Sequence, residues 1–365
     1  MAITLLYLLG ALFVILLVYY LGIFAGSVFG KPHETNAKRI PVSVIVYAKN
    51  NALELKSLLP ILLNQNYHQF ELVLVNNASA DETLDLFKEY ALMYPNIRVV
   101  DVVNNEAFWG NKKYALTLGI KASKYEYLAF IDADKKIHSN NWLVQLTSHF
   151  TLNKTIVAGT SYYTKQKGFF NKRFRFHHTM QQMQAIAWSK VSKPYHLQLH
   201  NIAFKKEDFY GVNGYINHMQ KRQFTNEYFL NDAATSKNTT ICEHNEAMLE
   251  VEPMNRKVFK EFKKQQIALL HDLKGTAGFK IKLFNTCQFL FLVVALASFF
   301  FNPAFWYVTL AMLLLRYILG WIIFSKAAKK YHYKDLIILY PILDFLYIFM
   351  QIQLFLGNLV SKSKS

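Results

Sequence analysis

Long apolar stretches occur only near the two ends of the chain, and a region that mixes charged and apolar residues separates them. Each stretch is long enough to cross a hydrocarbon core of roughly 30 Å as a helix. The stretches run over 3–24, 283–301, 304–324 and 336–360. This pattern predicts an N-terminal transmembrane helix over 1–25, a transmembrane helix hairpin over 280–325 and a third C-terminal hydrophobic segment over 336–360.

Two of these predictions have alternatives. The last segment contains Pro341 and Asp344, so a re-entrant or interfacial segment competes with a further span. A cleaved signal peptide competes with the N-terminal anchor. The anchor is favoured because no positive residue precedes the first run, and because the run is longer than the apolar part of a typical signal peptide.

Basic residues indicate how the chain crosses the membrane. Lys31, Lys38 and Arg39 follow the first run, and further lysines over 326–330 follow the hairpin, which returns the chain to the same side. Loops rich in lysine and arginine stay in the cytoplasm. We therefore expect a multi-pass protein of the cell's inner (cytoplasmic) membrane, with the central region in the cytoplasm.

The central region alternates short apolar runs with segments of helical periodicity. The expected strands are VSVIVYA from Val42, FELVLV from Phe70, Ile97 to Val102, and YEYLAFI, which ends just before Asp132; the expected helices cover 53–65, 81–94 and about 112–122. This order predicts an α/β fold with a mainly parallel sheet covered by helices. In such folds ligands gather at the carboxyl ends of the strands.

Beyond residue 150 the pattern is looser. A strand is expected over 155–162, followed by a basic and aromatic stretch over 169–176 and a helix to about Ser189. The stretch over 259–273 reads as a basic amphipathic helix that lies at the membrane surface. We expect one domain over 40–275.

Composition narrows the class of protein. Hydrophobic residues make up 53% and the net charge is +17, which excludes disorder and suits a domain that lies against anionic lipid and handles phosphorylated substrates. Nucleic acid is not expected as a partner, because the basic residues are scattered and form no known motif. Cys242 and Cys287 are far apart and support neither a disulfide framework nor a zinc site.

Two carboxylates mark the candidate chemistry. Asp132 and Asp134 are separated by one residue at the end of a buried strand, so they can share a hard divalent cation and leave its other positions to water and phosphate oxygens. A solvated turn is the common alternative for such a pair. The apolar strand before it favours the metal site.

Four segments carry a resemblance to a known family. They are VSVIVYAKNN from Val42, VNNASADET from Val75, GNKKYALTLGIKAS from Gly110 and FIDAD from Phe130. In this order the chain resembles membrane-bound bacterial family 2 glycosyltransferases of the GT-A fold, a Rossmann-like nucleotide-diphospho-sugar transferase fold. The resemblance implies transfer of a sugar from a nucleotide-diphospho-sugar to an acceptor hydroxyl, usually with inversion.

The resemblance also implies roles around the donor. Asp134 would ligate Mg²⁺ or Mn²⁺ bridging the diphosphate, and Asp132 would contact the ribose or the metal. Lys112 would lie near the diphosphate, with an ordinary surface lysine as the alternative. Tyr47, Ala48 and Asn50, which follow the first strand, would line the nucleotide pocket.

The residues that would contact the base depart from the family pattern. Asn77 stands where relatives usually carry an aspartate, with Asn76 beside it. An amide pairs with uracil as well, so a UDP-sugar is favoured, but the base stays open. Plain turn residues are the alternative for both.

The motifs expected for transfer itself are incomplete. Where the family carries a pair of acids, this chain has Asn226 and Glu227, so Glu227 is the predicted general base, with Asp232 as the second choice. Of the later QxxRW-like motif only Gln265 remains, which is assigned to donor binding. Asn201 matches an asparagine of close relatives.

The predicted function is a membrane-anchored glycosyltransferase that acts on a lipid-linked or membrane-delivered acceptor. The losses around Asn226 and Ala268 favour, as the alternative, a relative that binds nucleotide-sugar or a partner protein without turnover. A nucleotidyltransferase is a third possibility, against which stands the lack of a glycine-rich basic loop after the first strand.

Overall fold

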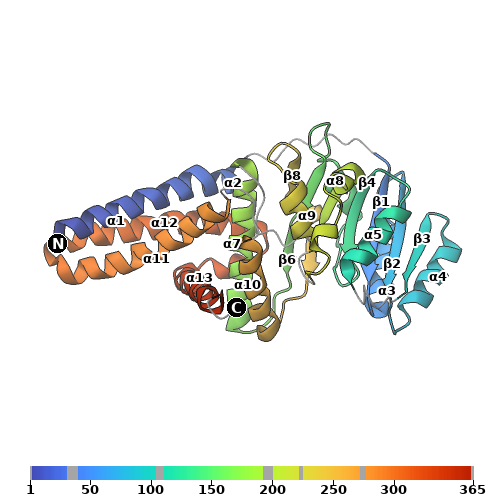
Figure 1. Ribbon diagram of the computed structural model, residues 1–365. Helices are drawn as coiled ribbons and strands as arrows, with labels where there is room; N and C mark the ends of the chain where they lie inside the picture. Colours follow the sequence, from blue (N-terminus) through green and yellow to red (C-terminus); the bar gives the residue numbers. More distant parts are fainter. Residues whose placement is uncertain are drawn as a thin grey trace. The chain divides into compact units, whose positions relative to one another are not determined.

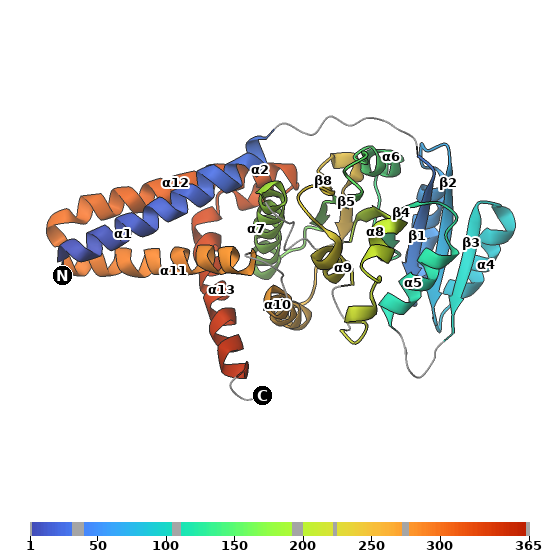
Figure 2. The ribbon, with the colours of Figure 1, turned by 45° about the horizontal axis from the view of Figure 1, so that its top comes forward.

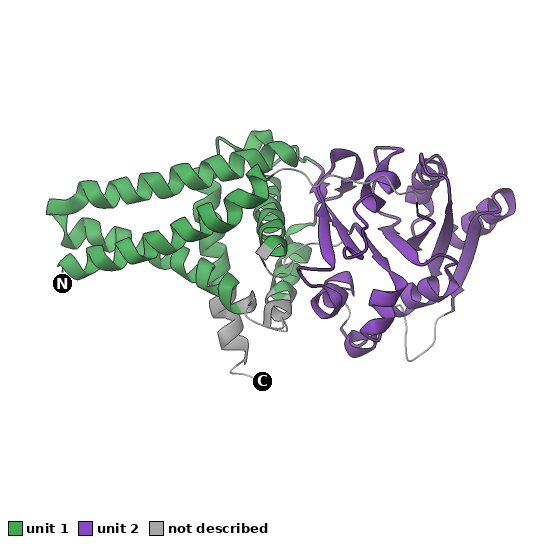
Figure 3. Cartoon of the chain, turned by 90° about the horizontal axis from the view of Figure 1, so that it is seen from above, with its two compact units in different colours: residues 1–31, 165–192, 254–365 green, residues 32–164, 193–253 purple. Residues whose placement is uncertain are grey.

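The computed structural model describes residues 2–30, 40–103, 111–191, 200–221, 225–271 and 277–362. The contacts within it divide the chain into two compact units (Figure 3). The helical unit comprises residues 1–31, 165–192 and 254–365, and the sheet unit comprises residues 32–164 and 193–253. Both units are discontinuous in sequence. The predicted domain boundaries, which follow the chain linearly, stay a prediction.

A seven-stranded sheet forms the centre of the sheet unit, in the order β3-β2-β1-β4-β7-β5-β8 (Figure 1). Its strands are β1 (Val42–Ala48), β2 (Phe70–Asn77), β3 (Ile97–Val102), β4 (Tyr127–Asp132), β5 (Ile156–Gly159), β7 (Ile202–Lys205) and β8 (Thr239–Cys242). β3, β2, β1 and β4 run parallel to one another, whereas β7 runs antiparallel to both β4 and β5. The α/β class and the mainly parallel sheet predicted from the sequence are confirmed.

Helices α3 (Ala52–Leu63), α4 (Thr83–Met93) and α5 (Lys112–Ala122) connect the parallel strands. The strands are nearly continuous apolar runs because helices cover the sheet, and β1 and β2 are buried along almost their whole length. Gly119 lets α5 lie directly on the sheet: a Cβ there would come within 2.7 Å of Val75 and 3.2 Å of Ile45.

The second half of the sheet unit differs in detail from the prediction. The single strand expected over 155–162 is two strands, β5 and β6 (Ser161–Tyr163), interrupted at Thr160. The backbone divides because β5 belongs to the large sheet, while β6 pairs with β9 (Leu249–Val251) in a separate two-stranded sheet. Shorter elements complete the unit: α6 (Trp142–Thr147), α8 (Lys206–Gly211), η3 (Ile216–His218), α9 (Thr225–Ala233) and η4 (Asn245–Ala247).

The helical unit contains the apolar stretches. Its elements are α1 (Ala2–Leu17), η1 (Val18–Phe24), α2 (Ala25–Phe29), α7 (Phe169–Val191), α10 (Arg256–His271), α11 (Ala277–Phe301), η5 (Pro303–Phe305), α12 (Trp306–Lys330), η6 (Lys334–Leu336) and α13 (Tyr340–Lys362). Within the described residues, three helical stretches are long and apolar enough to cross a membrane: 3–29, 279–301 and 303–330. α1, α11 and α12 pack against one another and run side by side (Figure 2).

Two ion pairs tie the remaining helices of this unit together. The Arg316 guanidinium on α12 donates to the Asp344 carboxylate on α13, and both side chains are fully buried. Arg175 on α7 donates to both carboxylate oxygens of Asp335, at 2.9 and 2.7 Å. Helix α13 is not one of the three candidate spans in the described part of the chain. The choice between a span and an interfacial segment there stays open.

Candidate functional site

The candidate site lies in the sheet unit, where β1 and β4 end. Register pairs Tyr47 on β1 with Asp132 on β4, and the Ala133 amide donates to the Tyr47 carbonyl at 2.8 Å. The chain after Asp134 is held by a bridge to β9, in which Lys136 and Glu250 exchange backbone hydrogen bonds of 3.0 Å. The two aspartates therefore lie on a short backbone segment that is fixed at both ends.

Each aspartate is paired with a lysine. The Lys112 ammonium lies 2.5 and 2.6 Å from the two carboxylate oxygens of Asp132, and the Lys135 ammonium lies 2.5 Å from one oxygen of Asp134. The Asp132 side chain is 22% exposed and the Asp134 side chain 54% exposed. Asp132 thus faces inward to its lysine, while Asp134 is open to a ligand.

Opposite charges outweigh burial in setting the pKa values of Asp132 and Lys112. Burial alone would raise the pKa of Asp132, but the ammonium groups of Lys112 and Lys135 outweigh it and hold that pKa below its usual value. Burial would lower the pKa of Lys112, and Asp132 reverses that effect so that the pKa lies above its usual value. Both groups therefore carry their charge at neutral pH.

The start of α5 places Lys112. Asn111 caps this helix, since its side chain accepts a 2.9 Å hydrogen bond from the Lys113 amide. The Lys112 ammonium also lies 4.7 Å from the centroid of the Tyr47 ring. These contacts favour a role for Lys112 in a charged site over the alternative of an ordinary surface lysine.

The turns after β1 and β2 are joined by side chains. Asn50 has a left-handed backbone (φ 55°), its amide donates to Ser79 at 2.9 Å, and its side chain accepts from the Ala80 amide at 2.7 Å. The Asn77 side chain donates to the Tyr47 hydroxyl at 2.9 Å. Ala48 is fully buried at the end of β1.

Asn76 has partners of its own. Its amide group donates to Asp101 at 2.7 Å and its oxygen accepts from the Ser79 amide at 3.2 Å. These bonds join β2 to the neighbouring strand and shape the turn that follows. They favour the structural alternative for Asn76, while its assignment to the base stays a prediction.

The two candidate bases differ in their surroundings, although both lie on α9. Asp232 is 7% exposed and lies 2.8 Å from the His218 ring. Glu227 interacts electrostatically with Lys113 and with Tyr215, and Tyr215 also responds to Asp132. Glu227 is therefore within electrostatic reach of groups around the aspartate pair.

Lys113 is a cation that interacts electrostatically with Glu227. Its side chain is fully buried and its ammonium donates to the Lys221 carbonyl. Burial is the main cause that lowers the pKa of Lys113 to about 8; the ammonium groups of Lys112 and Lys221 act in the same direction, and Glu227 acts in the opposite direction.

Two further predicted residues lie elsewhere. Asn201 is fully buried, and its amide donates to the carbonyls of Thr160 and Ala247 at 3.3 and 2.6 Å. It fastens backbone segments together. Gln265 belongs to α10 of the helical unit, and its side chain lies outside the described residues.

Sequence reasoning missed four polar residues of this region. Lys135 was detectable, because it directly follows Asp134 and pairs with it. His200 contributes to the low pKa of Asp132, and Tyr215 interacts with the carboxylates of Asp132 and Glu227. The backbone carbonyl of Lys221 accepts the hydrogen bond from Lys113. These three come from loops far from the motif in sequence, and no local pattern marks them.

The carboxylates fit a hard cation that a ligand helps to hold. No group of three or more His, Cys, Asp or Glu side chains that could hold a metal occurs in the described part of the chain. Asp134, half-exposed and bonded through one oxygen, offers a hard oxygen donor at the surface of the site. Such a site would need diphosphate oxygens and water to complete its coordination.

Comparison with known proteins gives a family. Residues 43–219 match the family model described as Glycosyl transferase family 2. The uncharacterized glycosyltransferase YibD of Escherichia coli (strain K12) is 26% identical over 106 residues, which are 29% of this chain and 29% of that protein. The uncharacterized glycosyltransferase EpsJ of Bacillus subtilis (strain 168) is 29% identical over 122 residues, 33% of this chain and 34% of that protein. The chain therefore spans about a third of the length of these curated relatives.

A solved structure extends the likeness in fold. The mannosyltransferase PcManGT from Pyrobaculum calidifontis, solved in complex with GDP-Man and Mn²⁺, superposes with a TM-score of 0.57 over 91% of this chain and 99% of that chain, at 16% identity. At this identity the likeness shows the fold alone. Together these findings confirm the resemblance to family 2 glycosyltransferases over residues 43–219 and the GT-A fold predicted from the four sequence motifs.

Proposed function

Given that this chain carries a family 2 glycosyltransferase domain, we propose that it transfers a sugar from a nucleotide-diphospho-sugar to an acceptor at the membrane, with inversion. The observation that carries the proposal is the pair of aspartates, each bonded to a lysine, at the end of β4 and beside the end of β1. This is the sheet edge at which α/β folds bind nucleotides.

The lysines suit a diphosphate. Lys112 and Lys135 bring two positive charges to the edge of the sheet, and ammonium groups bind phosphate oxygens as compact point charges. The leaving nucleoside diphosphate gains negative charge as the bond to the sugar breaks, so cations fixed beside it stabilise the transition state. A divalent cation (Mg²⁺ or Mn²⁺) held by Asp134 would neutralise further charge on the diphosphate.

The acceptor proton needs a base. We assign this role to Glu227: the acceptor oxygen bonds to the anomeric carbon, the bond from that carbon to the diphosphate breaks, and the acceptor proton passes to the Glu227 carboxylate. The electron pair leaves with the nucleoside diphosphate. Lys113 supports the assignment because its charge, near Glu227, favours the ionised carboxylate.

The nucleobase of the donor is assigned less specifically than its diphosphate. Asn77 offers both donors and an acceptor, and we favour a UDP-sugar on that ground. PcManGT, which shares the fold, is solved with GDP-Man. Competition between UDP-sugars and GDP-sugars for the purified protein distinguishes the two.

Membrane attachment is part of the proposal. Three candidate spans fit a membrane protein, and the basic residues after the first span and after the hairpin favour a cytoplasmic sheet unit at the inner membrane. A cytoplasmic domain held at the membrane meets acceptors that are linked to lipid or delivered there.

The test is metal-dependent turnover of nucleotide-sugar by the purified full chain. D134N keeps the size of the side chain but removes its charge, so turnover or donor hydrolysis should fall about 100-fold. D85N, the same change on the exposed face of α4, is the matched control and should stay near wild type. Unchanged turnover in D134N would overturn the assignment.

A second candidate function is donor binding without turnover. The observation that favours it is Asn226, an amide where the family carries an acid, which accepts a 3.2 Å hydrogen bond from the Tyr215 hydroxyl. Binding of nucleotide-sugar to the wild type with no turnover across a broad set of acceptors would support this function over transfer.

A further inference from the structure

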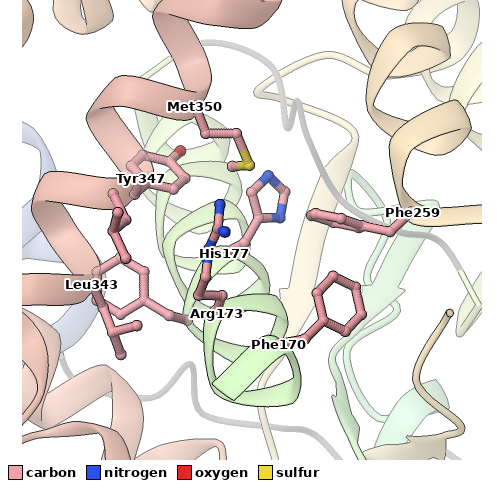
Figure 4. Close-up of a pocket in the computed structure, with 9 residues that line it drawn as sticks. Phe170, Arg173, His177, Phe259, Leu343, Tyr347 and Met350 are labelled. Atoms are coloured by element: carbon pink, nitrogen blue, oxygen red, sulfur yellow. The ribbon is translucent and has the colours of Figure 1, made fainter. Parts of the chain in front are cut away.

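The helical unit contains a pocket of its own. It is formed by α7, α10 and α13 and is partly open to solvent; its empty space, counted together with the solvent at its open side, is about 450 Å³ (Figure 4). Seven of its nine lining residues are aromatic or apolar; the lining consists of Phe170, Arg173, Phe176, His177, Phe259, Leu343, Leu346, Tyr347 and Met350. A chain of carbon atoms is therefore compatible with most of its wall.

Aromatic rings are packed around one side of this pocket. Phe259 on α10 meets Phe170 and His177 on α7 edge to face, with centroid distances of 5.8 and 5.4 Å. His177 in turn lies 5.7 Å from the Tyr347 ring on α13. These contacts hold the three helices around the cavity.

Two basic side chains enter the pocket from the same face of α7. Arg173 and His177 are one turn apart, and Figure 4 shows both projecting between Tyr347 on one side and Phe259 on the other. Behind His177, the Lys263 ammonium contacts the ring nitrogen Nε2 and donates to Gln266 at 2.9 Å. Lys263 is 3% exposed.

Arg173 and Lys263 lack acidic counterparts in the part of the chain that the structure describes. Within the described residues, neither Arg173 nor Lys263 has a carboxylate in a hydrogen bond or ion pair. Arg175, two residues along the same helix, is bonded to both oxygens of Asp335. Burial, with no carboxylate to offset it, lowers the pKa of Lys263 to about 7. Arg173 is exposed to solvent, whereas the buried Lys263 ammonium is a charge of the kind that is normally compensated by an anion.

We propose that this pocket binds the phosphate of a lipid monophosphate, with the first carbons of the lipid chain along the aromatic and apolar wall. A phosphate monoester carries a charge between about −1.5 and −2 at neutral pH, which matches the unpaired cations. The Arg173 guanidinium presents a planar fork of donors suited to phosphate oxygens. The apolar wall selects a lipid over free phosphate.

Binding of such a lipid does not require sugar transfer. The lipid would also carry the acceptor if the proposed function holds. The acceptor class would then be a phosphate-linked lipid. A binding measurement separates the two claims, because D134N should bind the lipid normally even though it loses turnover.

The experiment titrates the full chain in detergent micelles with farnesyl phosphate, farnesol and inorganic phosphate, and follows binding by calorimetry. Farnesyl phosphate should bind, and both farnesol and inorganic phosphate should bind at least about tenfold more weakly. R173Q should weaken farnesyl phosphate binding about tenfold, because a hydrogen-bonded charge is lost. K172Q removes the same charge from the neighbouring position on α7, outside the pocket lining, and should bind as the wild type does.

K263M provides a second variant in which a flexible apolar chain replaces the buried ammonium, and it should also bind more weakly. Wild-type affinity in both R173Q and K263M would overturn the proposal. So would equal affinity for farnesol, which would indicate an apolar pocket without a phosphate site. Equal affinity for inorganic phosphate would overturn the assignment to a lipid.

Discussion

The candidate donor site of the sheet unit and the pocket of the helical unit use basic residues in opposite ways. In the sheet unit, Lys112 and Lys135 each lie against an aspartate. In the helical unit, Arg173 and Lys263 have no acidic partner among the described residues. The first cluster is neutral overall and must exchange partners when a ligand arrives. In the second, no acid among the described residues balances Arg173 and Lys263, so an anion can bind there without displacing a partner.

The largest expected effect concerns Glu227, the proposed general base. E227Q should lower turnover about 1000-fold, because an amide cannot take the acceptor proton. Donor binding should be unchanged, since Glu227 is not assigned to the diphosphate. Initial rates with saturating donor and a separate nucleotide-binding titration measure the two quantities.

Asp232 provides the comparison for that variant. D232N removes a carboxylate that already lies 2.8 Å from the His218 ring, so we expect a loss of less than about tenfold in turnover. If D232N were impaired more severely than E227Q, the base would be Asp232 and the assignment to Glu227 wrong.

An intermediate effect should follow from separating the acid and the lysine at Asp132. K112M removes the ammonium that contacts both Asp132 oxygens, so a divalent cation no longer competes with it. We expect severalfold tighter Mn²⁺ binding but about tenfold slower turnover, because the diphosphate loses a cation. Free Mn²⁺ is followed by electron paramagnetic resonance.

K56M serves as its control, since Lys56 forms an exposed 3.8 Å ion pair with Glu82. Such surface pairs contribute little, so neither Mn²⁺ affinity nor rate should change. Identical Mn²⁺ affinities in K112M and the wild type would show that the lysine and the metal do not compete for Asp132.

The smallest effect is on stability. The pKa of Lys263 is lowered to about 7 in the folded protein, below that of an unfolded lysine, so the folded state loses this proton first as the pH rises. Lys263 therefore destabilises the fold most at low pH, and stability should increase by up to about 1.4 kcal/mol per pH unit above pH 7. Thermal unfolding of the wild type and K263M between pH 6 and 9 should show a steeper rise in the wild type, because the lowered pKa of Lys113 contributes to both proteins alike. Parallel curves would contradict it.

How far the sequence predicts the structure differs between the two units. The βα repeat of the sheet unit was predictable because apolar runs of strand length alternate with helical periodicity, and β3 and α5 have the predicted bounds. Asp132 and Lys112 were predicted together from a family motif, and their contact agrees with a shared site.

The rest depends on contacts between distant parts of the chain. The residues around Thr160 read as one strand, since a strand pattern does not show that β5 and β6 join different sheets. His200 lowers the pKa of Asp132, and Asp132 raises that of Tyr215, through contacts that only the tertiary fold creates. The pocket was not predicted at all, because its helices α7, α10 and α13 come from separate segments, and only packing brings Arg173 near Tyr347.

The discontinuity of the helical unit has a consequence for synthesis. α7 leaves the ribosome before α12 and α13, against which it packs, have been made. Phe176 on α7 contacts Phe324 on α12 and Tyr347 on α13, so this apolar face has no partner until the C-terminal third of the chain emerges. A shortened protein intended to contain the sheet unit alone must therefore omit residues 165–192 as well as the two ends, or it will carry an uncovered apolar helix in its middle.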